Sequence, residues 1–111
     1  MTFGGTKPTK IPHFFYAIII PMKTIEQLKQ FLIETFPHER IFLFGSRGRG
    51  EASEHSDIDI AIKSNKSLKG ALAHARFVIE ESHIPYKVDL VELSKAPYLE
   101  QIIEKEGVLW H

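Results

Sequence analysis

The chain has 111 residues, of which 43% are hydrophobic and 25% are charged, as in an ordinary globular protein. This length accommodates one domain with a core of its own, but it is short for an enzyme that must hold two substrates. Fourteen basic residues balance fourteen acidic residues, so no overall field draws the protein to nucleic acid or to a membrane surface. The lack of cysteine excludes disulfides, thiolate zinc sites and a cysteine nucleophile, and it fits a cytoplasmic protein.

Residues 1–21 differ from the rest of the chain because glycines and prolines interrupt a short apolar run, Phe14 to Ile20. This run is far below the ~20 residues that cross a bilayer, and it lacks a secretory cleavage site. We expect an N-terminal extension here. Two interpretations stay open: a segment that docks on the sheet or on a partner, or a stretch upstream of a natural start at Met22.

A first helix is predicted to begin after Met22 and to end before Pro37. Thr24 and Gln27 fit a capping box, in which each side chain bonds to the backbone N–H of the other residue. Apolar residues follow at helical spacing and predict a face that packs on the core: Ile25, Leu28, Leu32 and Phe36.

A strand and a glycine-rich turn come next. Residues Ile41–Phe44 are apolar at every position, which predicts a strand covered on both faces. The segment Gly45–Gly50 contains three glycines in six residues, and glycine lets the backbone approach another group closely. Backbone N–H groups of such a turn, with the Ser46 hydroxyl, can hold an anion. We therefore predict a phosphate-binding turn.

The strand Asp57–Ile62 alternates acidic and apolar residues. Ile58, Ile60 and Ile62 share one face, so Asp57 and Asp59 point together from the other. These carboxylates could form the solvated face of an ordinary strand. Asp is nevertheless a poor strand residue, and like charges on one face repel unless a cation lies between them. Because the glycine-rich turn directly precedes this strand, we favour a metal site at Asp57 and Asp59 over a solvated strand face.

The remaining chain predicts a helix, a strand and a final helix. Ser67 is the expected cap of a helix that ends near Glu81. In the strand Tyr86–Leu93, Asp89 lies on an otherwise apolar side, where a lone acid needs a partner or a metal unless it is simply at the surface. The buried face of the middle helix is predicted to comprise Leu68, Leu72, Ala75 and Ile79.

The last helix is predicted to begin at Ser94 or Lys95, with Pro97 in its first turn, and to end at Gly107. The residues Val108–Trp110 then pack back on the sheet or form an edge strand. Three apolar residues of the helix are expected to face the core: Leu99, Ile102 and Ile103. This order of elements predicts an α+β fold with a small mixed β-sheet backed by helices.

The spacing of the central motifs resembles a known family. Gly45-Ser46 is followed, after ten residues, by Asp57-x-Asp59 in an apolar strand, which is similar to the signature of the DNA polymerase β-like nucleotidyltransferase superfamily. The fuller Gly-Ser-Arg-x-Arg-Gly and Ser-Asp-Ile-Asp-Ile motifs resemble its minimal members (MNT type), usually paired with a helical protein of the HEPN type. The resemblance covers residues 22–111, which it implies to be a nucleotidyltransferase domain with the polymerase β-like core.

The resemblance implies a metal-dependent enzyme that transfers a nucleoside monophosphate, AMP from ATP, to an acceptor hydroxyl. It assigns the catalytic and metal-binding roles to three carboxylates: Asp57, Asp59 and Asp89. These would hold two ions of Mg²⁺ or Mn²⁺ about 3.5–4 Å apart, which matches the preference of such ions for oxygen ligands. Asp89 would lie nearest the acceptor.

The glycine-rich turn supplies the implied contacts to the nucleotide phosphates. These are Gly45, Ser46, Arg47 and Arg49. For the two arginines, ion pairs with Glu51 or Glu54 stay an alternative.

The resemblance also implies a partner. Nothing after the third strand resembles the helical domain with which larger nucleotidyltransferases hold base and acceptor, so a partner or a second copy is expected to complete the site. The implied partner is a HEPN-type protein whose tyrosine receives AMP in a toxin–antitoxin system, this chain being the antitoxin. The alternative is a non-catalytic binding protein that neutralises its partner by masking a surface.

Two other classes of function are disfavoured. The six histidines include no pair at i and i+4, so no zinc site is expected. There is no basic stripe with interleaved aromatic residues, so a nucleic-acid-binding module has little support. The base, the acceptor and the oligomeric state are not determined by the sequence.

Overall fold

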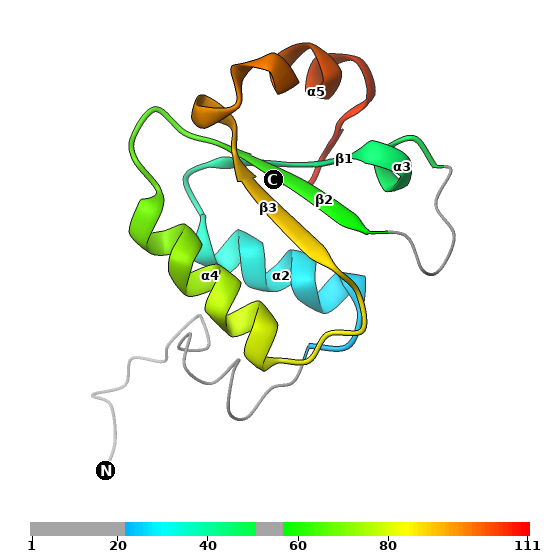
Figure 1. Cartoon of the computed structure of the whole chain (residues 1–111), viewed down its shortest axis with the longest axis vertical. Coiled ribbons are helices and arrows are strands. Elements are labelled where there is room, and N and C mark those ends of the chain that lie inside the picture. Colours follow the sequence, from blue (N-terminus) through cyan, green and yellow to red (C-terminus); the bar gives the residue numbers. More distant parts are fainter. Residues whose placement is uncertain (1–21, 51–56) are drawn as a thin grey trace, which may run out of the picture.

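A computed structural model describes residues 22–50 and 57–111. A mixed sheet lies between two layers of helices, which confirms the predicted α+β fold (Figure 1). The helices are α2 (Ile25–Thr35), α3 (Gly45–Gly48), α4 (Lys69–Glu81) and α5 (Glu100–Glu106), and the strands are β1 (Arg40–Phe44), β2 (Ile58–Lys63), β3 (Val88–Glu92) and β4 (Val108–Leu109). Two short 3₁₀ turns, Leu93–Lys95 and Pro97–Leu99, join β3 to α5.

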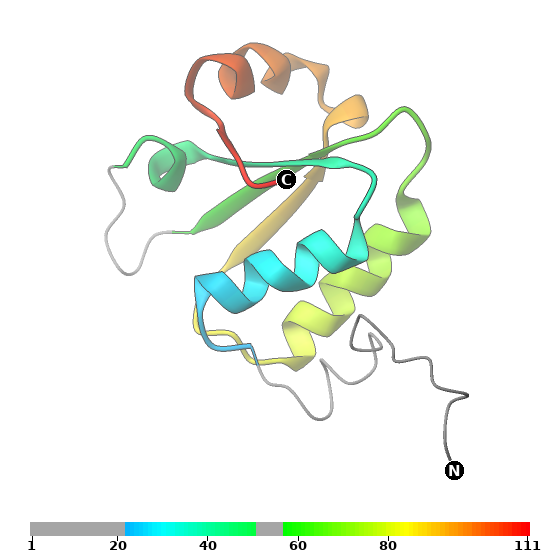
Figure 2. The same cartoon turned by 180° about the vertical axis from the view of Figure 1, so that it is seen from behind.

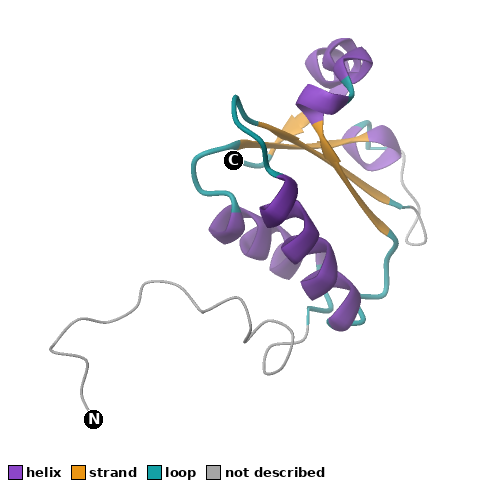
Figure 3. Cartoon of the chain, turned by 60° about the vertical axis from the view of Figure 1, so that its left-hand side comes forward, coloured by secondary structure: helices purple, strands orange, loops and turns teal. Residues whose placement is uncertain are grey.

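The strand order is β3-β2-β1-β4. Strand β1 runs antiparallel to both β2 and β4, whereas β2 and β3 are parallel. Parallel neighbours need a crossover, and α4 supplies it. Helices α2 and α4 cover one face of the sheet and α5 covers the other, as the view from behind and the side view also show (Figures 2 and 3). The predicted edge strand at the C-terminus is confirmed by β4.

Two hydrophobic cores lie on opposite faces of the sheet. Ile58, Ile60 and Ile62 are fully buried in the larger core, against α2 and α4. Ala61 points the other way, into a smaller core with Leu93, Leu99 and Ile103. The alternation predicted for β2 is therefore confirmed, and it places the odd-numbered residues of this strand on the α5 face.

The first helix has the predicted capping box. The Gln27 N–H donates to Thr24 Oγ1 over 3.1 Å, and the Thr24 N–H donates to Gln27 Oε1 over 3.2 Å. Phe36 is the C-cap residue, directly before Pro37. The first strand differs slightly from the expectation: Ile41 is buried, but the rest of Ile41–Phe44 is only half-buried. Residues 1–21, with the predicted extension, lie outside the described residues.

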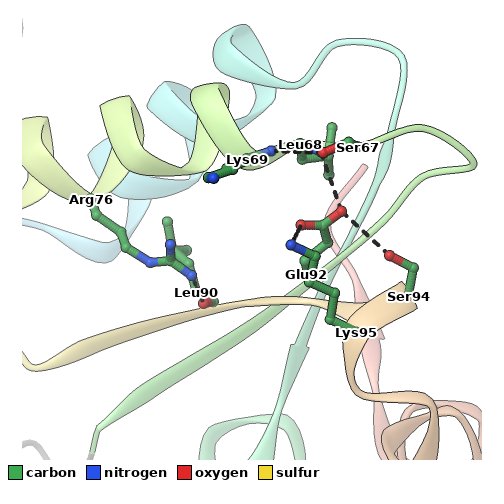
Figure 4. A network of polar contacts seen from close by, with 8 residues as sticks. All are labelled: Ser67, Leu68, Lys69, Arg76, Leu90, Glu92, Ser94 and Lys95. Atoms are coloured by element: carbon green, nitrogen blue, oxygen red, sulfur yellow. Dashed lines mark hydrogen bonds and ion pairs between the residues drawn. The ribbon is translucent and has the colours of Figure 1, made fainter.

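The predicted cap of α4 at Ser67 is wrong. The N-cap residue is Leu68, and the Ser67 hydroxyl only accepts a long bond of 3.4 Å from the Lys69 N–H. Glu92 of strand β3 caps the helix instead. The Leu68 N–H donates a hydrogen bond of 3.2 Å to Oε2 of this buried residue (Figure 4). Sequence spacing could not reveal a cap that comes from β3.

The predicted start of the last helix is also wrong. The 3₁₀ turns replace its first part, and α5 begins only at Glu100. Proline disfavours helical geometry in the residue before it, and Ala96 accordingly has φ −138° and ψ 61°. Leu99 and Ile103 are buried as expected, but Ile102 is 40% exposed. No described helix is long and apolar enough to cross a membrane.

Glu92 should be a structural residue. Its Oε2 also accepts a hydrogen bond from Ser94 Oγ over 3.3 Å, so Glu92→Leu leaves a buried N–H and a hydroxyl without an acceptor. We expect Glu92→Leu to lower the free energy of unfolding by about 2 kcal/mol, and Glu92→Gln by less, because the amide keeps one acceptor oxygen. Urea unfolding checks this, and equal stability of Glu92→Leu and wild type would contradict it.

Candidate active site

The three predicted carboxylates come from neighbouring strands. Asp59 of β2 pairs with Phe44, the last residue of β1, on one side and with Asp89 of β3 on the other. Asp57 lies just before β2, two residues from Asp59 and on the same face. The parallel register thus places Asp59 and Asp89 side by side where β1 ends and the glycine-rich turn begins.

Gly45 and Asp59 are in close contact. A Cβ atom built on Gly45 would lie 2.5 Å from Oδ2 of Asp59, and the glycine has a φ of +74°. Only glycine meets both requirements without strain. The turn therefore brings its backbone directly against the central carboxylate, as the sequence analysis expected of a residue that permits close approach.

The predicted phosphate turn folds as the single helical turn α3. Gly48 packs closely against β1 and α5, because a Cβ there would lie 2.9 Å from the Leu43 carbonyl oxygen and 3.1 Å from that of Glu106. The Arg49 guanidinium forms an ion pair of 3.1 Å with Glu106 at the end of α5. Helix α5 thus supports the turn. Glu51 and Glu54, the alternative partners of the arginines, lie outside the described residues.

Arg47 links the turn to the segment before β3. Its guanidinium carbon lies 5.1 Å from the centroid of the Tyr86 ring, within the range of a cation–π interaction. Neither Tyr86 nor Lys87 was predicted from the sequence to be a site residue. Lys87 shares the face of Asp89, two residues away, so the period of two could have revealed it.

The carboxylates influence one another electrostatically. Burial raises the pKa of the Asp59 carboxyl, the charges of Asp89 and Asp57 raise this pKa further, and Lys87 lowers it in part. Asp59 is half-buried, whereas Asp57 and Asp89 are exposed. Of the alternatives that the sequence left open for Asp89, the structure thus favours a position at the surface. Asp89 belongs to β3, an edge strand of the sheet, where water reaches its side chain.

This donor set fits a hard divalent cation. Carboxylate oxygens are the ligands that Mg²⁺ and Mn²⁺ prefer, and a cation would offset the repulsion that raises the Asp59 pKa. Across residues 22–50 and 57–111, no three His, Asp or Glu side chains stand close enough together to hold an ion as they are. To hold an ion together with Asp59, the side chains of Asp57 and Asp89 would have to move, and both are exposed to solvent. Their role as ligands stays a prediction.

Comparison with known proteins identifies the family. The profile of the family described as "Polymerase beta, Nucleotidyltransferase" matches residues 26–111. The chain belongs to this nucleotidyltransferase family. It is 34% identical over 80 residues to a probable protein adenylyltransferase, MntA, of Haemophilus influenzae, covering 70% of this chain and 69% of that protein. It is 31% identical over 96 residues to a putative protein adenylyltransferase of Methanocaldococcus jannaschii, covering 77% of this chain and 96% of that protein.

This nucleotidyltransferase should not tolerate a side chain at Gly45. In Gly45→Ala the new methyl group displaces the Asp59 carboxylate, and we expect nucleotidyl transfer to fall about 100-fold. Gly50→Ala is a matched control, because Gly50 has a similar φ of +76°, but among the described residues, apart from its chain neighbours, none comes within 4 Å of the added Cβ. It should lose about 1–2 kcal/mol of stability and keep its activity. Equal activity of the two variants would contradict this role of Gly45.

Burial of Asp59, together with charge repulsion from Asp89 and Asp57, should lower the stability of the metal-free protein. Since the folded state raises its pKa, Asp59 stabilises the fold less as pH rises from about 4 through that raised pKa. At neutral pH, we expect Asp59→Asn to melt about 2–6 °C higher than wild type, and the difference should vanish near pH 4 or below. Thermal unfolding without divalent ions measures it. A lower melting temperature for Asp59→Asn at neutral pH would contradict the prediction.

Proposed function

We propose that this protein transfers AMP from ATP to a hydroxyl group of another protein. The observation that carries the proposal is the register of Asp59 with Asp89, next to a glycine turn that contacts Asp59. The family supports nucleotidyl transfer, and the two relatives named protein adenylyltransferases support AMP and a protein acceptor.

Each part of the site has a proposed task. The backbone of Gly45 and Ser46, with the Ser46 hydroxyl, binds the β- and γ-phosphates. Arg47, held over the ring of Tyr86, lies at the end of the same turn and offers its charge to the phosphates. Arg49 is already paired with Glu106, so we assign it to support of the turn as well as to phosphate binding.

The carboxylates Asp57, Asp59 and Asp89 are proposed to bind the divalent ions, Mg²⁺ or Mn²⁺. When bound, a divalent cation supplies positive charge at the α-phosphate and lowers the pKa of the acceptor hydroxyl. Asp89 lies on the outermost strand, so it faces an incoming acceptor and takes its proton. The acceptor oxygen bonds to the α-phosphorus, the bridging P–O bond to the β-phosphate breaks, and pyrophosphate leaves.

The biological setting is proposed from the motif resemblance. The acceptor would be a tyrosine of a helical HEPN-type partner, and its modification would make this chain the antitoxin of a cytoplasmic toxin–antitoxin pair. The small size of the described domain supports the idea that the partner or a second copy completes the site. Residues 1–21 are proposed to be an extension of the nucleotidyltransferase domain.

The test is transfer of radiolabel from ATP to protein in a lysate of the source cells, with Mg²⁺. We expect α-labelled ATP to label a protein and γ-labelled ATP not to, because the β- and γ-phosphates leave as pyrophosphate. Asp57→Asn, Asp59→Asn and Asp89→Asn should each reduce labelling by about 100-fold or more. Glu104→Gln, an exposed acid on α5, should not.

Two results would contradict the proposal. Full labelling by Asp59→Asn would remove the metal-binding role of the central carboxylate. Absence of label with any of the common nucleotides, although the partner is shown to be present, would favour the non-catalytic masking protein instead.

A further inference from the structure

The outer edge of β3 borders a large hollow. The hollow has a volume of about 700 Å³ and lies between β3 and the second half of α4. Its lining combines apolar with charged or polar side chains: Ile79, Ile84, Val88 and Leu90 with Arg76, Glu80, His83 and Asp89. A hollow of this size, in which apolar groups are combined with polar ones, can hold part of a ligand.

The hollow reaches the proposed active site. Asp89 lines it and also stands in register with Asp59 on the α5 face of the sheet. Tyr86 also lines the hollow, and its ring forms the cation–π contact with Arg47 of the turn. A molecule seated in the hollow therefore touches the strand that carries the carboxylate nearest the acceptor.

The backbone of β3 is available for pairing along this edge. In the parallel ladder the Ile58 N–H donates to the Lys87 carbonyl oxygen over 2.8 Å, so by alternation Asp89 turns its backbone groups toward β2. Val88 and Leu90 then direct theirs outward. Within the described part of the chain, no strand pairs with the outer edge of β3.

Arg76 of α4 limits which part of the edge is open. Its Nη2 donates over 2.8 Å to the carbonyl oxygen of Leu90, as Figure 4 shows. A side chain that occupies an edge carbonyl blocks pairing there. The open stretch is consequently at Val88, directly beside Asp89.

We propose that an extended segment of the acceptor protein pairs with the backbone of Val88 and places its apolar side chains in this hollow. The inference rests on the proposed function, because a protein acceptor is the substrate that can offer a peptide backbone to a strand edge. Main-chain pairing would give affinity, and the apolar lining residues Ile79, Ile84 and Val88 would give selectivity. Pairing beside Asp89 would bring a hydroxyl of that segment to the carboxylate proposed to take its proton.

Matched tryptophan variants test the docking surface. Glu80 and Glu104 are exposed helical residues that line hollows at the β3 edge and the β4 edge, respectively. With the protein that wild type labels, purified, we expect Glu80→Trp to lower kcat/KM for labelling about 10-fold or more, and Glu104→Trp to change it less than about 2-fold. Both variants should keep the wild-type melting temperature and its increase with Mg²⁺-ATP.

A direct binding measurement accompanies the kinetics. Adding the purified acceptor should slow hydrogen exchange of the Val88 amide about 10-fold or more, and should leave the amides of β4 unchanged. Equal labelling by both tryptophan variants, or unchanged exchange at β3, would overturn the inference while leaving the proposed function intact.

The remaining outcomes are also decisive. If Glu80→Trp loses its stabilisation by Mg²⁺-ATP, the hollow holds the nucleotide and not the acceptor. If wild type labels no protein, both the proposed function and this inference are overturned.

Discussion

The contact between the Asp59 carboxylate and the backbone of Gly45 is the constraint on which the site depends. The position of Gly45 follows from β1, which ends at Phe44 opposite Asp59, and its φ of +74° turns the chain into α3 without a Cβ that would meet the carboxylate. The turn that we propose to bind phosphate and an acidic residue are thereby held together. This arrangement is unfavourable alone, because burial and neighbouring charges raise the Asp59 pKa, but it suits a cation shared by carboxylates and phosphates.

The topology explains how so small a domain can build such a site. The parallel pairing of β2 and β3 aligns Asp59 with Asp89, and α4, which connects these strands, also packs over the larger core. At the far end of β3, the buried Glu92 accepts a bond from the start of α4 and fixes the strand to the helix. On the other face, α5 supports the turn through Gly48 and Arg49. Of the three carboxylates, Asp89 lies on the edge strand β3, and both Asp57 and Asp89 are exposed to solvent.

The sequence predicted the features that depend on local pattern. The alternation of β2, the capping box of α2 and the need for glycine at position 45 follow from side-chain period, cap chemistry and backbone freedom, and the motif spacing indicated the family. Features that depend on tertiary contact were missed. Glu92 caps α4 from strand β3, and Tyr86 contacts Arg47 across the site. For Asp89 the sequence left a buried and a surface position open, and the place of β3 at a sheet edge decides for the surface. The sequence also predicted one helix with Pro97 in its first turn, whereas two 3₁₀ turns precede α5.

The central claim is that Asp57, Asp59 and Asp89 gather a divalent cation beside Gly45. The most direct measurement is a ¹H–¹⁵N spectrum of the protein titrated with Mn²⁺, whose unpaired electrons broaden the signals of nearby amides. The account predicts that the signals of Gly45, Asp59 and Asp89 broaden first, and that the signal of Glu92, a buried acid at the other end of β3, broadens later. Broadening that begins around Glu92 or α5, with Gly45 left sharp, would contradict it.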